Sequence, residues 1–306
     1  MILTETEKNI LKPLAHFDVL DYPLTLLEIQ RYSGEKLAAG EISAALNGEA
    51  LGRLVGQRQG LYFLTGREAI IASRLTRYRL AVSKLKKAAR FARLFSLFPW
   101  IRAVAIYSSL SLKNSRADGD LDFFFITAAD RAWSARFFIN SFLKIFRLRP
   151  TPQTARDQLC ASYWVDENNL DLSIANFDED YFYTYGCAAF CFMSGSTELK
   201  NNFYQANDWI KTILPNWQPN LNSKQNKPTN IERLAQRLLE FIFQPLSETA
   251  IRKWQLKIMP EKYSKHQDGK KIITDAGVIK LHDNDKRSEY NRRFKINFDR
   301  LINYGD

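Results

Sequence analysis

The amino-acid sequence predicts an α+β protein in which a mixed sheet is flanked by helices. Two short apolar runs, one within residues 101–109 and one within residues 118–127, are rich in β-branched and aromatic residues and indicate two strands joined by a polar segment. Long stretches on both sides carry apolar residues at helical spacing. With 306 residues, the chain has room for two or three domains. We predict a small domain over residues 1–67, a connecting helix over 68–99, a sheet domain over 100–178 and a mainly helical C-terminal region over 179–306.

The first domain is predicted to combine short helices with a strand. Apolar spacing indicates a helix over Thr4–Phe17, and Thr25 followed by Glu28 resembles the capping box of a second helix. A third helix is predicted over Gly40–Val55 and a strand over Leu61–Leu64. Three short helices and a β-wing are typical of a winged helix-turn-helix, whose third helix usually enters a DNA groove. Here that helix is acidic, so a structural or protein-binding role is favoured over DNA reading.

The net charge of +11 suits a nucleic acid, a nucleotide or an anionic membrane surface as partner. A basic surface kept for solubility explains the same charge. The best nucleic-acid candidate is the long helix predicted over Glu68–Phe98, although such a charge run is more often a solvated face. Its basic residues are Arg74, Arg77, Arg79, Lys84, Lys86, Lys87, Arg90 and Arg93.

Two carboxylates open the second predicted strand. Asp120 and Asp122 are two residues apart, and the period of a strand places both side chains on the same face of the sheet. Like charges this close are costly unless a cation lies between them. Oxygen ligands without nearby sulfur or imidazole favour Mg²⁺ or Mn²⁺ over zinc. We therefore predict a metal site at this pair; a solvated acidic turn that includes Asp118 is the alternative.

A pair of small residues precedes this strand. Ser108-Ser109 ends the first predicted strand, and Asp120-Leu121-Asp122 begins eleven positions after Ser109. This arrangement resembles the signature of the nucleotidyltransferase superfamily that includes DNA polymerase beta. Ser109 matches the family serine, and Asp120 and Asp122 match its metal-binding pair. Ser108 stands where the family usually has glycine, a residue that adopts unusual backbone dihedrals at no steric cost.

The resemblance implies a nucleotidyltransferase-like mixed sheet and a transfer reaction. A nucleoside monophosphate would pass from an NTP to an acceptor hydroxyl, with Mg²⁺ (or Mn²⁺) as cofactor and pyrophosphate as product. Ser108, Ser109 and Lys113 would bind phosphate. Arg131 and Arg136, near the start of the next helix, would reach the triphosphate, unless each forms a salt bridge instead. The alternative is a non-catalytic regulator on the same fold that senses nucleotide or binds protein or nucleic acid.

The superfamily carries a third carboxylate on a strand after the intervening helix, where it binds metal and accepts the proton of the attacking hydroxyl. Leu159–Val165 is predicted as the next strand, with Leu170–Ile174 as its hairpin partner. Asp171 is the acid inside that second run and is our candidate for the third catalytic, metal-binding carboxylate. A surface acid on an edge strand is the alternative for Asp171, and Asp166 and Glu167 stay open as candidates.

The region after residue 180 is predicted to be mainly helical. The helices cover Tyr181–Met193, Glu198–Leu214 and Ile231–Met259, and a strand and a final basic helix, Lys286–Ile302, complete the chain. We expect the apolar side of Ile231–Met259 to pack within the chain rather than against a partner or a membrane surface.

Cysteine usage and hydropathy bear on the compartment. The three cysteines, Cys160, Cys187 and Cys191, form neither a disulfide framework nor a zinc spacing. A reducing cytoplasm fits this usage. No apolar run reaches the length of a membrane span, and the N-terminus lacks the form of a signal peptide. We expect a cytoplasmic protein whose partners are an NTP and an acceptor, with nucleic acid as a further candidate.

Overall fold

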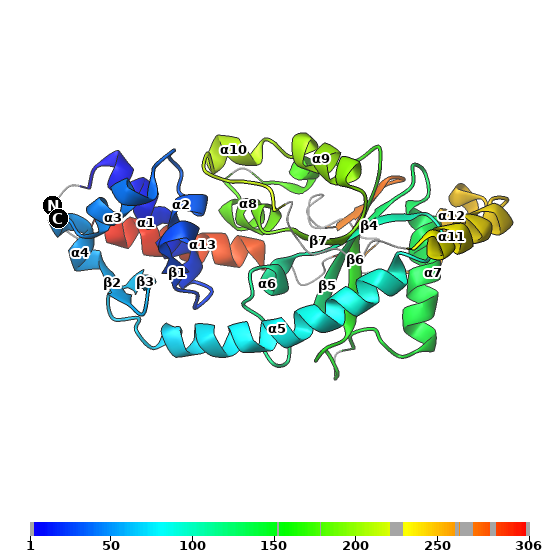
Figure 1. Cartoon of the computed structure of the whole chain (residues 1–306), viewed down its shortest axis with the longest axis horizontal. Coiled ribbons are helices and arrows are strands. Elements are labelled where there is room, and N and C mark those ends of the chain that lie inside the picture. The colour runs from blue at the N-terminus through cyan, green and yellow to red at the C-terminus, as the bar shows by residue number, and fades with distance from the viewer. Residues whose placement is uncertain are drawn as a thin grey trace.

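The structure is a computed structural model that describes residues 3–151, 153–177, 179–220, 229–260, 263, 272–281 and 286–303. Helices and strands are mixed along the chain, and the strands form two sheets in the described part. The α+β class predicted from the sequence is therefore confirmed. Figure 1 shows an elongated molecule with the smaller sheet towards one end and helices α11 (Asn230–Phe243) and α12 (Glu248–Ile258) at the other.

The N-terminal unit packs short helices against a three-stranded sheet of order β1-β3-β2. Its helices are α1 (Glu5–Asp18), α2 (Leu26–Tyr32), α3 (Ala39–Leu46) and α4 (Glu49–Leu54), and its strands are β1 (Leu24–Thr25), β2 (Val55–Arg58) and β3 (Leu61–Leu64). The capping box of α2 is present, because Thr25 accepts from the Glu28 amide and the Glu28 carboxylate accepts from the Thr25 amide at 2.8 Å. The single helix predicted over Gly40–Val55 is wrong. It is interrupted at Asn47-Gly48, two poor helix formers, and Gly48 caps α4 instead.

Helix α5 (Ile70–Phe95) runs from the N-terminal unit to the larger sheet. It packs on β4 and β7 of that sheet through a buried side that contains Ala81, Ala88 and Ala92. Its first turns carry cations that are not simply solvated. Arg74 pairs with Glu28 at 2.9 Å, and Arg77 pairs with Asp21 at 3.3 Å. These basic residues therefore dock the helix on the N-terminal unit, which corrects the expectation of a solvated charged face for this part of α5.

The larger sheet has six strands in the order β7-β4-β5-β6-β9-β8. β5 and β6 are parallel, and the other neighbouring pairs are antiparallel. The strands are β4 (Ile101–Ile106), β5 (Leu121–Thr127), β6 (Leu159–Asp166), β7 (Cys191–Ser194), β8 (Ile272–Thr274) and β9 (Val278–Leu281). Three of them lie after residue 178. The boundary predicted there therefore cuts through one sheet, and the C-terminal region supplies strands as well as helices.

Helices cover both faces of this sheet. Phe123 and Phe125 of β5 point to the face that α5 and α7 (Ala132–Ile145) cover, and Phe125 stacks on Trp164 of β6 with ring centroids 4.0 Å apart. Phe124 and Ile126 point to the opposite face, where α8 (Tyr181–Ala188), α9 (Thr197–Ala206) and the N-terminal unit contribute to one core. Strand alternation places Asp122 on this second face.

Two predicted elements after β6 have a different structure. Leu170–Ile174 is not a strand, because Asp171 caps a 3₁₀ helix, η1 (Leu172–Ala175). The helix predicted over Tyr181–Met193 ends at Ala188 and is followed by β7, so Cys187 and Cys191 do not share a helix. The run Glu198–Leu214 is divided into α9 and α10 (Ile210–Ile213). A short apolar run fits either a helix or a buried strand. The run that follows α8 is the strand β7 because it pairs with β4.

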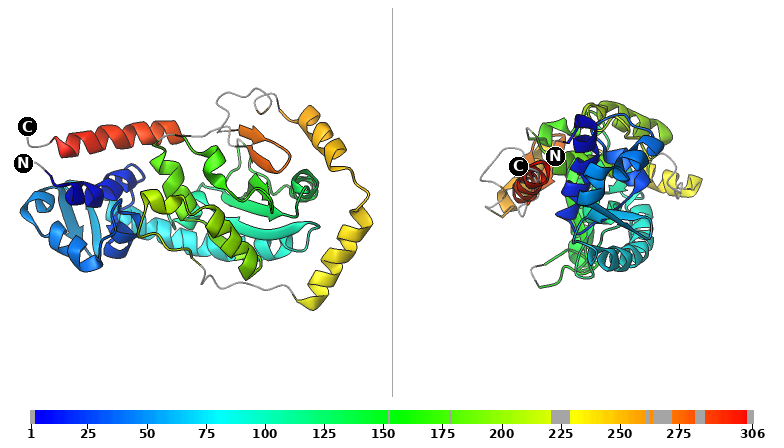
Figure 2. Two further views of the ribbon diagram at one scale, coloured as in Figure 1. Left: turned by 90° about the horizontal axis from the view of Figure 1, so that it is seen from above. Right: turned by 90° about the vertical axis from the view of Figure 1, so that its left-hand side faces the viewer.

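The C-terminal helices lie at opposite ends of the molecule. α13 (Arg287–Ile302) packs along α1, where Phe294 is buried with Ala15 and Val19, and Figure 2 shows it beside the N-terminal unit. α11 has no buried residue, so the predicted packing of the apolar side of Ile231–Met259 within the chain is wrong for most of α11. It is confirmed for Phe243 and for Ile251 and Leu256 of α12, which pack against the core beside α7. None of the helices in the described part of the chain has the length and apolarity needed to cross a membrane.

Candidate functional site

The two carboxylates at the head of β5 lie beside a thiol of β6. Ligand atoms of Asp120, Asp122 and Cys160 all lie within 4.8 Å of one another, and all three side chains are half-buried. Asp122 and Cys160 are register partners on the parallel strands β5 and β6. The alternation of β5 thus brings the two aspartates together as predicted. Among the described residues, these are the three His, Cys, Asp or Glu side chains that lie close enough together to share a metal ion.

The electrostatics of this group favour a cation. Burial, together with the neighbouring Asp120 charge, raises the pKa of Asp122 to about 7. Burial also raises the pKa of Asp120, and the Lys84 ammonium and a hydrogen bond from Cys160 offset part of this rise. The pKa of Cys160 is well above its usual range because the thiol is buried beside both carboxylates. At neutral pH and without a cation, the group therefore contains a protonated thiol and an Asp122 carboxyl that is about half protonated, because burial and the Asp120 charge disfavour a second negative charge there.

The Ser108-Ser109 turn adjoins this group at the end of β4. Ser108 has a φ of +63°, in the left-handed region that favours glycine. This backbone costs a residue with a Cβ about 1–2 kcal/mol. The family signature usually has glycine at this position. The backbone conformation of this chain favours glycine there as well. The Ser108 side chain is hydrogen-bonded to Asp122, and Ser109 is exposed.

Lys84 is a neighbour of the site that the sequence did not single out. Its side chain on α5 is only 6% exposed, and its ammonium donates to the carbonyl of Gly119 and pairs with Asp157 at 3.4 Å. In the sequence it is one of many cations on a long helix. Lys84 lies three residues after Ala81 and four before Ala88. This helical spacing places it on the same buried side of α5 as the two alanines.

A cavity of about 350 Å³ opens beside the Ser108-Ser109 turn. Its walls are mainly aromatic and come from α1, β6, α8, α13 and the turn that follows β4. They include Tyr107, Tyr163, Tyr183, Tyr185 and Phe190. Lys280, Lys286 and Arg287 contribute cationic groups, and none of the described residues that line the cavity carries a carboxylate. The Tyr107 hydroxyl contacts Ser162 Oγ at 3.1 Å, and Ser162 Oγ accepts a hydrogen bond from the Cys160 thiol at 3.3 Å. Tyr107 and Ser108 therefore connect the cavity with the carboxylate group.

Comparisons with protein families, with curated proteins and with solved structures found no match to this chain. The resemblance therefore depends on the two-strand signature alone. What the site does has to be argued from the side chains that the fold brings together.

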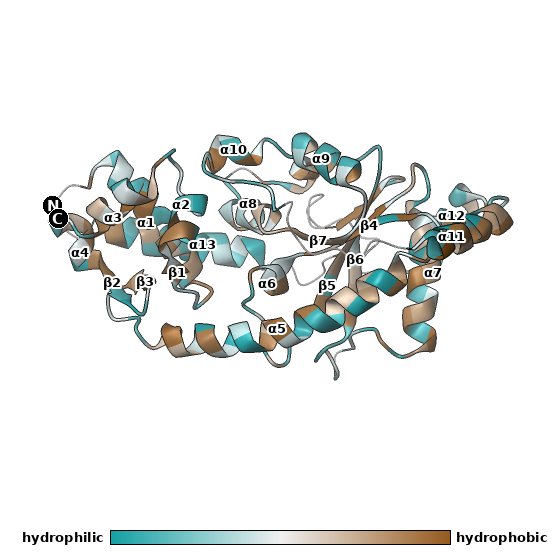
Figure 3. Cartoon of the chain, in the orientation of Figure 1, coloured by the Kyte–Doolittle hydropathy of each residue, from teal (hydrophilic) through white to brown (hydrophobic). Residues whose placement is uncertain are grey.

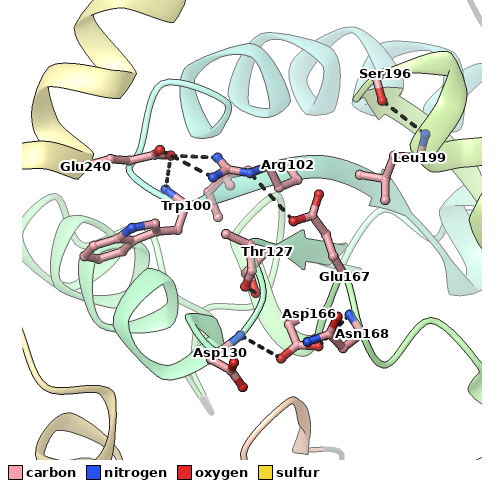
Figure 4. A network of polar contacts seen from close by, with 12 residues as sticks. Trp100, Arg102, Thr127, Asp130, Asp166, Glu167, Asn168, Ser196, Leu199 and Glu240 are labelled. Carbon is pink, nitrogen blue, oxygen red and sulfur yellow. Dashed lines mark hydrogen bonds and ion pairs between the residues drawn. The ribbon is translucent and has the colours of Figure 1, made fainter. Parts of the chain in front are cut away.

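The candidates for a third carboxylate lie elsewhere. Asp171 is exposed, and its carboxylate accepts hydrogen bonds from the amide and hydroxyl of Ser173 at 2.8 and 2.9 Å. Asp166 is the last residue of β6, at the other end of the strands from Asp122. It accepts a hydrogen bond from the Asp130 amide at 3.1 Å (Figure 4). Glu167 lies 4.0 Å from Arg102. None of these acids belongs to the group around Asp122, and the third side chain of that group is Cys160.

The predicted phosphate-binding arginines also lie away from the carboxylates. Five residues of β5 follow Asp122, roughly 17 Å of strand, and Arg131 lies beyond the strand's end. Arg131 donates to the carbonyl oxygens of Gln244 and Leu246, at 3.2 and 2.9 Å. Arg136 is buried and donates to Gln255 of α12. Both arginines thus hold the C-terminal helices in place, and neither forms a salt bridge with a described residue.

Lys113 follows the short helix α6 (Ser108–Ser111) and is exposed. Its ammonium lies 5.7 Å from the ring centroid of Tyr78 on α5. Of the predicted nucleotide-binding cations, Lys113 is therefore the one that stays near the Ser108-Ser109 turn in the chain and has a solvent-accessible charge.

Proposed function

We propose that the chain is a metal-dependent nucleotidyltransferase that moves a nucleoside monophosphate from an NTP to an acceptor hydroxyl. The observation that carries this proposal is the position of Asp120 and Asp122. The pair lies at the head of one strand, its carboxylates repel each other, and it adjoins a serine turn that borders a cavity. The larger sheet would then be a nucleotidyltransferase-like sheet. The N-terminal unit would be a winged helix that binds protein rather than DNA, since α3 carries an acid and no basic residue.

The donor set fits one magnesium ion. Mg²⁺ is commonly held by one or two carboxylates while substrate phosphates and water complete its octahedral shell, and Asp120 and Asp122 supply such ligands. The Cys160 thiol is protonated at neutral pH and soft, so it adds no ligand that Mg²⁺ prefers. A second ion would need a further carboxylate, and within the described residues none joins the pair.

The reaction would use the chain's own groups for positioning. The acceptor oxygen forms a bond to the α-phosphorus, the bond from that phosphorus to the bridging oxygen breaks, pyrophosphate leaves, and the hydroxyl proton passes to water. A bound magnesium ion would neutralise charge on the phosphates. Ser109 is exposed, and its hydroxyl would donate to a phosphate oxygen. The aromatic walls that include Tyr107 and Tyr163 offer faces on which a base or an acceptor ring stacks.

A specific observation favours a second candidate function. Cys160 takes the place of the third carboxylate, which in the superfamily activates the acceptor hydroxyl. A chain without that carboxylate would still bind Mg²⁺ and a nucleotide through Asp120 and Asp122. It would then act as a nucleotide-binding regulator, with the N-terminal unit as the part that contacts a partner protein.

Calorimetry and a pyrophosphate assay test both candidates. ATP is titrated into the chain with and without Mg²⁺, and pyrophosphate release is measured with all four NTPs and with a sugar, an RNA or a protein as acceptor. Asp120→Asn should abolish both signals, whereas Asp118→Asn, an exposed acid that pairs with Arg116, should change neither. Release supports the transferase, and Mg²⁺-dependent binding without release supports the regulator. Unchanged binding by Asp120→Asn would overturn both.

A further inference from the structure

Helix α11 exposes an unusually complete apolar stripe. Ile231, Leu234, Leu238, Phe241 and Ile242 lie at helical spacing, and their exposed fractions are 80, 69, 58, 79 and 55%. At 100° per residue these side chains occupy one side of the helix. Folded chains rarely leave so many large apolar groups together in water. The stripe lies on the end of the molecule opposite the N-terminal unit, where Figure 3 shows hydrophobic residues on α11 and α12.

The polar side of α11 is the side that attaches it to the protein. Glu232 pairs with Arg93 of α5 at 3.0 Å, and Glu240 pairs with Arg102 of β4 at 2.6 Å. Between them, the Gln236 amide donates to the carbonyl oxygens of Phe98 and Ile101, at 3.0 and 2.8 Å. The three anchors are four residues apart and therefore share one face of the helix.

The anchoring fixes the direction of the apolar stripe. Glu240 also accepts from the Trp100 amide at 2.8 Å, and Figure 4 shows its carboxylate held by Trp100 and Arg102 together. At the end of the helix, Phe243 packs on Phe138 of α7 with ring centroids 4.7 Å apart. An amphipathic helix normally buries its apolar face. Here polar contacts occupy the inner face, and the apolar face is turned outward.

Charge on α11 indicates what covers the stripe. Its two acids, Glu232 and Glu240, are each neutralised by an arginine of another element. Arg233 and Arg237 are exposed at the edge of the stripe, and neither forms an ion pair within the described part of the chain. The outward surface of α11 is thus apolar with a cationic border, on a chain whose net charge is +11. An apolar helix face with a basic border is typical of helices that lie on anionic bilayers.

We propose that α11 binds the surface of an anionic lipid bilayer, with its axis in the membrane plane and its apolar stripe among the acyl chains. Trp254 of the adjacent helix α12 is 49% exposed and adds an aromatic group of the kind enriched at bilayer interfaces. A second copy of α11 fits the apolar stripe less well than a bilayer does. Pairing two copies through this stripe would bring Arg233 and Arg237 of both chains to one seam, and like charges there repel.

Vesicle flotation of the full chain tests this proposal. The expected result is recovery with phosphatidylcholine vesicles that contain one part in three phosphatidylserine, and much weaker recovery with phosphatidylcholine alone. Leu234→Gln and Leu238→Gln should each lower the partition coefficient about tenfold or more. Arg233→Gln and Arg237→Gln should each lower it about fivefold at low salt. Leu27→Gln and Arg58→Gln are matched controls on the exposed surface of the N-terminal unit and should bind as the wild type does.

Two results would overturn the proposal. One is the absence of wild-type recovery with anionic vesicles. The other is a concentration-dependent dimer in analytical ultracentrifugation that the double change Leu234→Gln, Leu238→Gln dissociates while flotation stays negative, since that result assigns the stripe to a second copy. Circular dichroism of each variant checks that the exposed substitutions leave the fold intact.

Discussion

Asp122 and Cys160 face each other across the parallel strands β5 and β6, at the same register. The Cys160 thiol donates to Ser162 Oγ at 3.3 Å, and it is protonated because burial and the two neighbouring aspartates raise its pKa. Under the proposed function, a hard cation at this point would have two carboxylate ligands and would lack a third. Position 160 would then decide between a two-metal transferase site and a site for one ion and a nucleotide.

Replacing Cys160 with aspartate should complete the ligand set. Cys160→Asp is expected to raise Mg²⁺ affinity about tenfold or more, because a third carboxylate adds charge and a hard ligand. If transfer in this chain is limited by the missing acid, pyrophosphate release should rise as well. Without metal, the third like charge should lower the melting temperature, and Mg²⁺ should restore it. Calorimetry and thermal unfolding with and without Mg²⁺ measure these changes.

The control for this change is Cys160→Ser, which removes the thiol without adding a charge. It should leave Mg²⁺ affinity within about twofold of the wild type, since a neutral hydroxyl replaces a neutral thiol. Equal gains for Cys160→Ser and Cys160→Asp would show that position 160 does not contact the ion.

Asp122 should make the metal-free chain less stable as the pH rises. Its folded pKa of about 7 lies above its ordinary value of 3.8, so between these values the folded chain keeps a proton that the unfolded chain releases. Stability from this group is complete below pH 4 and is lost as the pH passes 7. Asp122→Asn removes this dependence and should stabilise the chain at pH 8, relative to pH 4, by about 4 kcal/mol.

Urea unfolding at the two pH values, with EDTA present, checks this expectation. Asp118→Asn is the matched control, because Asp118 is exposed and forms only a surface ion pair with Arg116. A stability gain for Asp122→Asn that is the same at pH 4 and pH 8 would contradict the raised pKa.

The sequence was most informative where structure depends on near neighbours. The Thr25 and Glu28 capping box, the long helix α5 and the alternating acids of β5 are local patterns, and each appears in the fold. Elements whose structure depends on residues far away in the sequence are not predicted correctly. β7 is a strand because it pairs with β4, and its four apolar and small residues looked the same as a helix end.

The candidate site shows the same division. Asp120 and Asp122 were visible as a pair, whereas Cys160 and Lys84 join them only through strand register and helix docking. Asp171 looked strand-like because apolar residues flank it alternately. In the fold its carboxylate caps η1, a local hydrogen-bonding role that competes with strand structure.

His16 should make the chain sensitive to acid. It is 2% exposed, and burial lowers its pKa to about 3, so the folded chain keeps it neutral where the unfolded chain protonates it. Its stabilising contribution is complete above pH 6.5 and is lost as the pH falls towards 3. Between pH 7 and pH 5, His16 alone should cost about 2 kcal/mol.

His16→Phe should remove this loss. The ring contacts of His16 include Tyr185, with centroids 4.3 Å apart, and a phenyl ring fits the same aromatic surroundings. Its Nδ1 has no hydrogen-bond partner in the described structure, so no bond is given up. Guanidinium unfolding of both proteins at pH 7 and pH 5 measures the difference, and a parallel loss in both would show that His16 is not the responsible group.

The buried ion pair of Arg287 and Asp180 should matter more than any surface pair of the same helix. The two side chains are 6 and 1% exposed and lie 3.0 Å apart. Asp180 also caps α8 by accepting from the Tyr183 amide, so the pair fixes α13 to α8. Arg287→Met leaves a buried carboxylate without its cation and should cost about 3–5 kcal/mol of stability.

Lys295→Met is the matched control on α13, because Lys295 pairs with Glu179 on the exposed surface, where both side chains are about half accessible. Exposed pairs contribute at most about 1 kcal/mol. Chemical unfolding at neutral pH compares the two variants. Since α13 also packs along α1, Arg287→Met should lower the unfolding midpoint of the N-terminal unit together with that of the sheet. Equal and small losses for Arg287→Met and Lys295→Met would mean that α13 is held by apolar packing alone.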